Sequence, residues 1–250
     1  MKRVFVFAAA LAVMVTVGYA YERQPVNVVR DYGAEQGSSV WQESSWPGGA
    51  PGVSDSHNNE KAKTGDYSFL TDATTPNSSG IYEMRLFQNF DFSFSPENLS
   101  FDYNLEFVDD DWDKSELFSI DLLNSDDTLT YIWAHPDISK NDDTNTKKYF
   151  YYNMPNDQNT WKSQFKNTSN DLSNKGWDGK EFDRLKLLSQ GETYQNIFYG
   201  QAVWWDNVSV KALVDHDLLA RDVVGLENIV PGQAWDFISS WYNNGTQKTS

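Results

Sequence analysis

The amino-acid sequence predicts an all-β protein that folds as a β-sandwich, and three features of the chain support this prediction. Apolar and polar residues alternate along much of the chain, most regularly in Phe101–Phe107 (FDYNLEF), as in a strand with one buried face. Segments rich in glycine, proline, asparagine, aspartate and serine separate these alternating stretches, as turns separate short strands. No long segment shows the apolar spacing of an amphipathic helix. Together these features are typical of a sandwich of many short strands.

The expected elements follow one another along the chain. The expected strands are Tyr82–Leu86, Phe90–Phe94, Phe101–Phe107, Phe118–Leu122, Leu129–Trp133, Lys148–Tyr152, Leu185–Leu187 and Val203–Val210. The expected turn-rich segments are Trp46–Asn59, Thr71–Gly80, Asp109–Asp113, His135–Thr146 and Asn153–Asn159. A short helical turn is expected within Lys162–Leu172.

The first 20 residues have the pattern of a secretory signal peptide. Lys2 and Arg3 precede the apolar run Val4–Val17, and Gly18–Ala20 offers small residues for cleavage. The apolar run is short for a membrane span, although an uncleaved anchor is the alternative. We therefore expect an exported protein, secreted or at the cell surface, with no membrane span after cleavage.

The charge of the chain limits its partners. The formal net charge is −16, and loss of Lys2 and Arg3 with the signal peptide would make it −18. A chain this acidic repels phosphate backbones, so we expect no nucleic-acid partner. Calcium, other cations and neutral sugars are compatible with this charge, and so is a saline habitat.

The residue composition bears on the core and on binding. The chain has no cysteine, which excludes disulfides and thiolate metal sites. It has 10 Trp, 13 Tyr and 15 Phe, more aromatic residues than a core of this size needs. Some rings should therefore lie on the surface, where aromatic faces are suited to bind sugars.

The late segment Ala202–Ala212 (AVWWDNVSVKA) carries a candidate metal ligand. Alternation along it places Asp206 on the same face as Val208 and Val210. A buried carboxylate is costly unless a cation or dedicated hydrogen-bond donors satisfy it. Glu35, in a glycine-flanked turn far upstream, is a plausible second ligand.

Three motifs together resemble the galactose-binding-like jelly rolls of many carbohydrate-binding modules. They are DYGAEQG within Asn27–Gly37, EKAKTGDYSF at Glu60–Phe69, and WWDNVSV within Ala202–Ala212. In that family the corresponding motifs read roughly N-G-G-x-E-x-G, H-S-G-x-Y-S and D-N-V-x-V. This chain departs from them at Asp31-Tyr32 and at Lys63-Thr64. Within Tyr151–Leu172, the Thr160-Trp161 pair and Asn170-Asp171-Leu172 add to the resemblance, which spans residues 25–212.

This resemblance implies a jelly-roll β-sandwich over residues 21–212, a non-catalytic role in binding a polysaccharide or glycan, and a structural calcium ion. Glu35 and Asp206 would supply carboxylate oxygens to the ion, and backbone carbonyls near Asp31 and Thr64 would complete the shell. The alternative is that Asp206 caps a turn and Glu35 is solvated. The acidic run Asp109–Asp113 lacks the EF-hand spacing and is interpreted as a solvated loop.

Tryptophans outside the alternating stripes are the candidate sugar platforms. The candidates are Trp46, Trp112, Trp41, Trp133, Trp161 and Trp177. Trp46 and Trp112 are preferred because their neighbours in sequence are polar. The alternative for each of the six is a place in the core, where single tryptophans are more often found.

Residues 213–250 differ in character from the rest of the chain. Asp217-Leu218, Pro231-Gly232 and Asn244-Gly245-Thr246 resemble the opening of an immunoglobulin-like adhesion module of the CARDB type. A complete module takes about 100 residues. The segment is therefore interpreted as part of a further domain of a longer surface protein, as a β-hairpin docked on the sandwich, or as a tail without a partner.

Two other functions remain as alternatives. One is a structural or adhesive surface spacer without sugar binding. The other is an extracellular polysaccharide lyase or glycoside hydrolase, for which Tyr131, His135 and Arg184 would be the lyase candidates. Candidate N-glycosylation sites, usable only in a host with the machinery, are Asn77, Asn98, Asn167, Asn207 and Asn244.

Overall fold

The structure is a computed structural model, and it describes residues 25–36, 40–75, 80–108, 116–194 and 197–213. The described chain consists almost entirely of β-strands, with one short helix, so the predicted all-β class is confirmed. The expected signal peptide and the CARDB-like segment lie outside the described residues. No helix of the described part is both long and apolar enough to cross a membrane.

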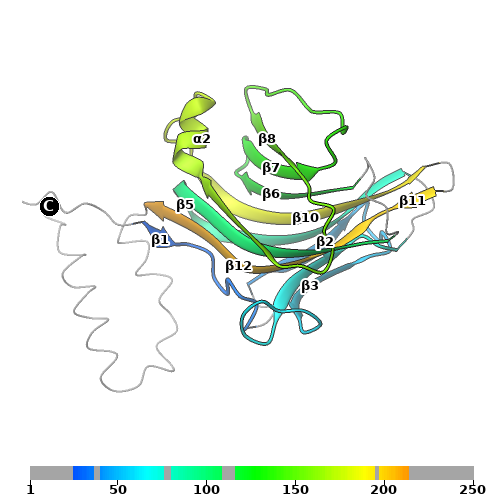
Figure 1. The fold of residues 1–250 in the computed structure, drawn as a ribbon. Coiled ribbons are helices and arrows are strands. Elements are labelled where there is room, and N and C mark those ends of the chain that lie inside the picture. Colours follow the sequence, from blue (N-terminus) through cyan, green and yellow to red (C-terminus); the bar gives the residue numbers. More distant parts are fainter. Residues whose placement is uncertain (1–24, 37–39, 76–79, 109–115, 195–196, 214–250) are drawn as a thin grey trace, which may run out of the picture.

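The elements follow one another in the order that Figure 1 labels. The strands are β1 (Val26–Asn27), β2 (Gln42–Trp46), β3 (Val53–Asn58), β4 (Ser68–Asp72), β5 (Gly80–Phe107), β6 (Leu117–Leu123), β7 (Thr128–Ala134), β8 (Lys147–Asn153), β9 (Lys162–Asn167), β10 (Phe182–Tyr194), β11 (Ile197–Tyr199) and β12 (Gln201–Leu213). The helix α2 (Thr168–Asn174) follows β9 directly.

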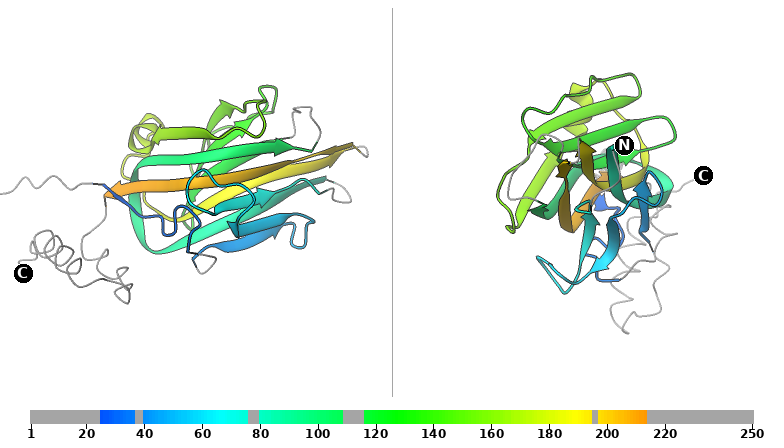
Figure 2. Two further views of the ribbon diagram at one scale, coloured as in Figure 1. Left: turned by 60° about the horizontal axis from the view of Figure 1, so that its bottom comes forward. Right: turned by 90° about the vertical axis from the view of Figure 1, so that its right-hand side faces the viewer.

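Strand β5 belongs to both layers of the sandwich, because its 28 residues pair with different neighbours along its length. Its second half joins sheet A, with the order β3-β4-β12-β5-β9 and with β1 paired to β12. Its first half joins sheet B, with the order β2-β5-β10-β6-β7-β8 and with β11 paired to β10. All these pairs are antiparallel except β7 with β8. Figures 1 and 2 show β6, β7 and β8 on one side of the long strands, and β3 and β4 on the other.

The core lies between the inner faces of the two sheets and is rich in aromatic rings. Phe101 of β5 packs edge-on against Trp133 of β7, with the ring centroids 5.1 Å apart. Trp205 of β12 contacts Phe118 of β6 in a similar way, at 5.5 Å. Residues from both layers thus interlock, which confirms the predicted jelly-roll sandwich architecture.

Some predicted boundaries were wrong. Tyr82–Leu86, Phe90–Phe94 and Phe101–Phe107, predicted as three strands, form the single strand β5. The predicted turn region Trp46–Asn59 contains β3, a polar strand at the edge of sheet A that has no alternation to reveal it. In Lys162–Leu172, where a helical turn was expected, the first half is strand β9 and the helix begins only at Thr168.

Candidate functional site

A β-bulge in β12 determines where the carboxylate of Asp206 lies. Asn207 has a φ of +51°, and the pairing of β12 with β5 shifts register between Asp206 and Ser209. The extra residue places both Trp205 and Val208 in the core and leaves Asp206 on the opposite face. The prediction that Asp206 shares a face with Val208 was therefore wrong, because strict alternation does not continue through a bulge.

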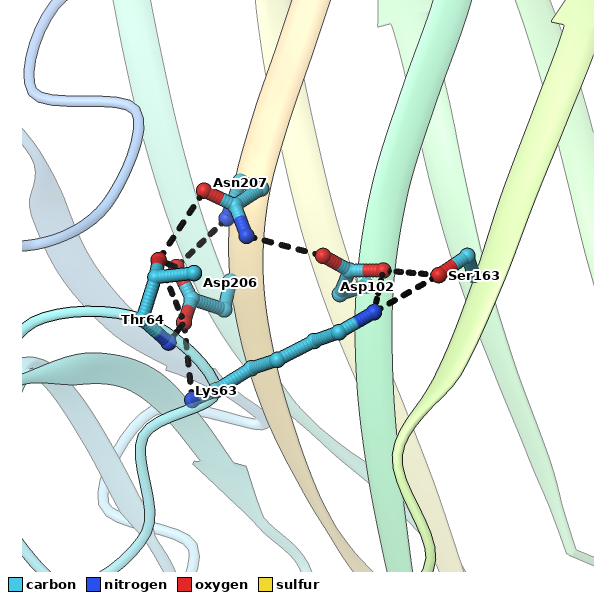
Figure 3. Close-up of polar contacts among 6 residues, drawn as sticks. All are labelled: Lys63, Thr64, Asp102, Ser163, Asp206 and Asn207. Carbon is cyan, nitrogen blue, oxygen red and sulfur yellow. Dashed lines mark hydrogen bonds and ion pairs between the residues drawn. The ribbon is translucent and has the colours of Figure 1, made fainter.

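Asp206 is nevertheless completely buried. Its carboxylate accepts hydrogen bonds from the backbone N–H groups of Lys63 at 2.9 Å, Thr64 at 2.8 Å and Asn207 at 2.6 Å (Figure 3). These dedicated donors satisfy the buried charge. They also tie the loop before β4 to the last strand of the sandwich.

A second carboxylate, Asp102 of β5, extends this polar network across sheet A (Figure 3). The Lys63 ammonium lies 2.7 Å from both the Asp102 carboxylate and the Ser163 hydroxyl. The Asn207 amide donates to Asp102 at 2.8 Å. Burial alone would raise the pKa of Asp102, but the hydrogen bonds from Lys63, Ser163 and Asn207 lower it overall.

The contact between Ser163 and Lys63 does not make a nucleophilic site. A lysine that activates a serine must be neutral in order to accept its proton. Here the Lys63 ammonium is instead held in an ion pair with Asp102. We therefore assign this network a structural role.

Three of the predicted metal residues, Asp31, Glu35 and Thr64, line a cleft of about 470 Å³, and the fourth, Asp206, lies beside it, bound to the Thr64 N–H. Gly33 sits between two of them, since a Cβ atom added there would lie 3.6 Å from Asp206 Oδ1 and 3.8 Å from Glu35 Cγ. Glu35 accepts hydrogen bonds from the backbone N–H groups of Asp66 and Tyr67, at 3.0 and 3.1 Å. Glu35 is thus bound to the same loop that holds Asp206.

Asp31 is the member of this group whose charge is least satisfied. Its Oδ1 accepts from the Gln36 N–H at 2.9 Å, but its Oδ2 is buried and has no hydrogen-bond partner among the described residues. Burial raises the pKa of Asp31 above its ordinary value. A cation bound at Oδ2 would satisfy this atom.

The ligand atoms that the cleft offers are of the type that binds calcium. Its side-chain ligands are oxygens, which calcium prefers, and calcium also accepts backbone carbonyls. Within the described ranges, however, no group of three or more acidic or histidine side chains is arranged to hold a metal ion. The backbone N–H groups already occupy oxygens of both Asp206 and Glu35.

Three of the predicted sugar platforms are core residues. Trp41, Trp133 and Trp177 are only 3%, 2% and 6% exposed. Trp41 packs against Phe69 at 4.6 Å, and Trp133 stacks on Phe118 at 5.3 Å. The prediction that these three tryptophans present exposed faces was wrong, since the sandwich needs their rings to fill its interior.

The other predicted tryptophans differ in exposure. Trp46, at the end of β2, is 50% exposed. Trp161 is half-buried against a small apolar cluster on sheet A that includes Leu70 and Trp204. Trp112 lies outside the described residues.

The register of sheet B shows which side chains point away from the core. Phe87 of β5 lies opposite Gln42 of β2 and Lys186 of β10. Paired residues point to the same face, and the neighbouring Leu86 is fully buried, so Phe87 faces outward. We call this side the outer face of sheet B. Its members include Gln42, Trp46, Arg85, Phe87, Tyr149, Tyr151, Arg184 and Lys186.

The middle of the outer face is a buried floor. Ser119, Ile132 and Leu188 lie side by side on β6, β7 and β10 and are 3%, 6% and 4% exposed, although they point away from the core. The floor also contains an ion pair between Lys186 and Asp121. The low exposure of these side chains means that neighbouring side chains cover them.

Aromatic side chains flank this floor on both sides. Trp46 of β2 lies on one side, with the Arg85 guanidinium 5.9 Å from its ring centroid. On the other side, Tyr149 and Tyr151 of β8 point the same way, with ring centroids 6.2 Å apart. The Tyr151 hydroxyl accepts a hydrogen bond from the Asn141 N–H at 2.8 Å, which fixes its ring.

The sequence analysis identified Trp46 but missed Phe87, Tyr149 and Tyr151. A signal for Phe87 was present, because it is out of phase with the buried stripe Tyr82, Met84 and Leu86. No such signal marks the tyrosines. The segment Lys147–Asn153 has aromatic residues on both faces.

The lyase candidates do not form a site. Tyr131 points into the core, is fully buried, and donates a hydrogen bond to Asp171 at 3.0 Å. Burial and the nearby Asp171 charge raise its pKa far above the ordinary value. Arg184 lies on the outer face of sheet B, the opposite side of the sheet. His135, just after β7, has the Asp137 carboxylate 3.9 Å away.

Two of the candidate glycosylation sites are occupied by structural contacts. The Asn207 amide nitrogen donates to Asp102, and the Asn167 side chain caps helix α2. Asn98 lies within β5, paired with both β12 and β9. Asn77 and Asn244 lie outside the described residues.

No protein-family model matches the chain, and no curated protein sequence does. Solved structures resemble it at low identity. A family 61 carbohydrate-binding module in complex with β-1,4-galactotriose is 12% identical, with a TM-score of 0.41 over 75% of this chain and 99% of that one. A family 11 carbohydrate-binding module of a cellulosomal cellulase of Clostridium thermocellum is 13% identical, with a TM-score of 0.38 over 77% and 96%. The enzymatically active domain of a bacteriophage CBA120 tailspike is 11% identical, with a TM-score of 0.38 over 76% and 22%. At these identities and scores the likeness is one of general fold and does not identify a function.

Proposed function

We propose that this chain is a secreted, non-catalytic carbohydrate-binding module that binds a polysaccharide along the outer face of sheet B. The observation that carries the proposal is the arrangement of this face. Aromatic rings on β2, β5 and β8 flank a buried floor that includes a paired lysine and aspartate. Sugar sites in proteins combine apolar rings with a few fixed polar groups in this way.

The rings can supply the apolar part of such a site. Trp46 is half exposed, and Phe87, Tyr149 and Tyr151 are partly exposed. A flat ring offers its face to the C–H groups of a pyranose, and an aromatic contact of this size contributes substantially to binding. Arg85, held by Glu83 at 2.5 Å, supplies a fixed donor beside Trp46.

A non-catalytic role is the better supported one, because the candidate catalytic groups among the described residues do not meet in one site. Tyr131 and Arg184 lie on opposite faces of sheet B. The Ser163–Lys63 contact is held in an ion pair with Asp102. The net charge of −16 favours neutral ligands and cations over anionic polymers.

The proposal includes a structural calcium ion at the cleft around Gly33. Asp31 Oδ2 and the Glu35 and Asp206 carboxylates would hold it with nearby backbone carbonyls, and the ion would neutralise their charge. Tying the first turn to the last strand would close a very long loop. In thermal melts, added calcium should raise the midpoint of the wild type and a chelator should lower it. Asp31→Asn should abolish this difference, whereas an equal midpoint in both buffers would refute the ion.

Affinity electrophoresis tests the binding itself. The wild type should be retarded in gels that contain one or more soluble polysaccharides, and Trp46→Ala should lose most of this retardation. Phe165→Ala is the matched control, because Phe165 is 65% exposed but lies on β9 of sheet A. No retardation by any polymer would favour the spacer function. Release of reducing ends or unsaturated products would show an enzyme. Export is tested by N-terminal sequencing of the secreted chain, which should begin at Tyr21.

A further inference from the structure

We infer that a cleft at one end of the outer face of sheet B binds a single neutral pyranose unit, and this inference rests on the proposed sugar-binding function. The cleft has a volume of about 430 Å³, which is enough for one small ligand. It lies where β2, β5 and β10 run side by side. Its lining residues are Gln42, Phe87, Asn89, Phe90, Asp183 and Arg184.

The pairing of the strands explains why these side chains converge. Gln42 lies opposite Phe87, and Asn89 lies opposite Arg184, so the four share the outer face. The register of β10 shifts between Phe182 and Arg184. This irregularity brings Asp183, which follows Phe182 in sequence, to the cleft together with Arg184.

Among the described residues, the polar side chains of the cleft have few partners, although the Asn89 carbonyl oxygen accepts a hydrogen bond from Arg30 Nη2 at 3.0 Å. Within the described ranges, the side chains of Gln42, Asn89 and Arg184 make no hydrogen bond or ion pair. Asp183 Oδ1 is buried and has no hydrogen-bond partner there. An unsatisfied buried carboxylate oxygen is costly, and a ligand hydroxyl that donates to it would remove this cost.

These groups are chemically complementary to a sugar. Asp183 can accept from a hydroxyl, while Arg184, Asn89 and Gln42 can donate to ring and hydroxyl oxygens. The partly exposed ring of Phe87 lies among them and can contact the C–H face of a pyranose.

The charges in the cleft point to a neutral sugar. Among the residues that line the cleft, the carboxylate of Asp183 offsets the guanidinium of Arg184, so the lining itself carries no net charge. The chain as a whole is strongly acidic. An anionic sugar would meet repulsion both from Asp183 and from the chain.

The test uses a panel of soluble neutral polysaccharides (glucan, galactan, mannan, xylan) and two polyuronates, polygalacturonate and alginate. At least one neutral polymer should retard the wild type, to the same extent in 50 and 500 mM NaCl. Asp183→Asn and Arg184→Ala should each weaken binding at least about tenfold, since each removes a hydrogen bond to a charged group. The control is Asp91→Asn on β5, the strand that pairs with β10, where Asp91 is exposed and outside the cleft.

The outcomes separate the cleft from the proposed function. Binding that is lost in Trp46→Ala but unchanged in Asp183→Asn and Arg184→Ala would refute sugar binding in the cleft. The proposed binding function of the outer face would still stand. Binding only to polyuronates, strengthened in Asp183→Asn and weakened by salt, would overturn the neutral assignment. Retardation by no polymer would overturn both. Thermal melts verify that the variants fold. If Arg184→Ala does not fold, Arg184→Lys takes its place, because lysine keeps the positive charge but lacks the planar guanidinium that forms paired hydrogen bonds.

Discussion

Replacing Asp206 with alanine should strongly destabilise the sandwich. Asp206 is fully buried and accepts three backbone hydrogen bonds of 2.6–2.9 Å from Lys63, Thr64 and Asn207. The variant leaves two N–H groups of the loop before β4 and one of β12 without their acceptor. At about 1–2 kcal/mol for each unsatisfied donor, we expect a loss of about 3–6 kcal/mol in the free energy of unfolding.

Urea unfolding followed by tryptophan fluorescence measures this loss. A domain of this size should also lose about 2–4 °C in melting temperature for each kcal/mol. Asp91→Asn, at an exposed position of β5, is the control and should change stability by less than about 0.5 kcal/mol. The loss should persist in chelator, because the N–H donors act without a cation. A loss below about 1 kcal/mol, or one seen only with calcium present, would refute this reasoning.

Two further predictions concern the same sandwich. The pKa of Asp102 is below its ordinary value of 3.8 in the folded state, so its stabilisation is complete above that value and disappears as the pH falls through the lower, folded pKa. The stability difference between wild type and Asp102→Asn in urea titrations should therefore be largest at neutral pH and shrink below pH 3.8. A difference that grows in acid would contradict a lowered pKa of Asp102 in the folded state. Trp205→Ala should cost about 3–5 kcal/mol in thermal or urea unfolding, because its fully buried ring contacts both sheets. Phe165→Ser replaces an exposed ring and should change the free energy of unfolding by less than about 0.5 kcal/mol. Equal losses of stability in Trp205→Ala and Phe165→Ser would show that Trp205 is wrongly assigned to the core.

The fold class was predictable because strand alternation is a local property. The pattern of Phe101–Phe107 alone specifies a half-buried strand, and the structure places Phe101, Tyr103 and Leu105 in the core. The continuity of β5 was not predictable. Its residues change sheets midway, and only the partners, β10 for the first half and β12 for the second, show where this happens.

The sequence motifs predicted which residues lie at the cleft around Gly33, but not which of their oxygen atoms accept hydrogen bonds from the backbone. The motifs identified Asp31, Glu35, Thr64 and Asp206, which lie around or beside one another in the structure. Which oxygens accept N–H groups depends on the path of the loop before β4. That path depends on contacts such as the one between Gly65 and Glu35, where an added Cβ atom would lie 2.1 Å from Glu35 Oε1.

The binding surface was harder to predict, because an aromatic residue in a strand is informative only once its face is known. The tryptophans chosen as lying outside the alternating stripes included Trp41 and Trp133, which the core requires. Phe87, by contrast, breaks the phase of its own strand, and its partly exposed ring lies on the outer face of sheet B. A ring of this kind, set beside an unsatisfied carboxylate such as Asp183, is better evidence of a ligand than any count of aromatic residues. Whether Asp183→Asn and Phe87→Ala weaken sugar binding together, while folding stays intact, is therefore the decisive comparison for this surface.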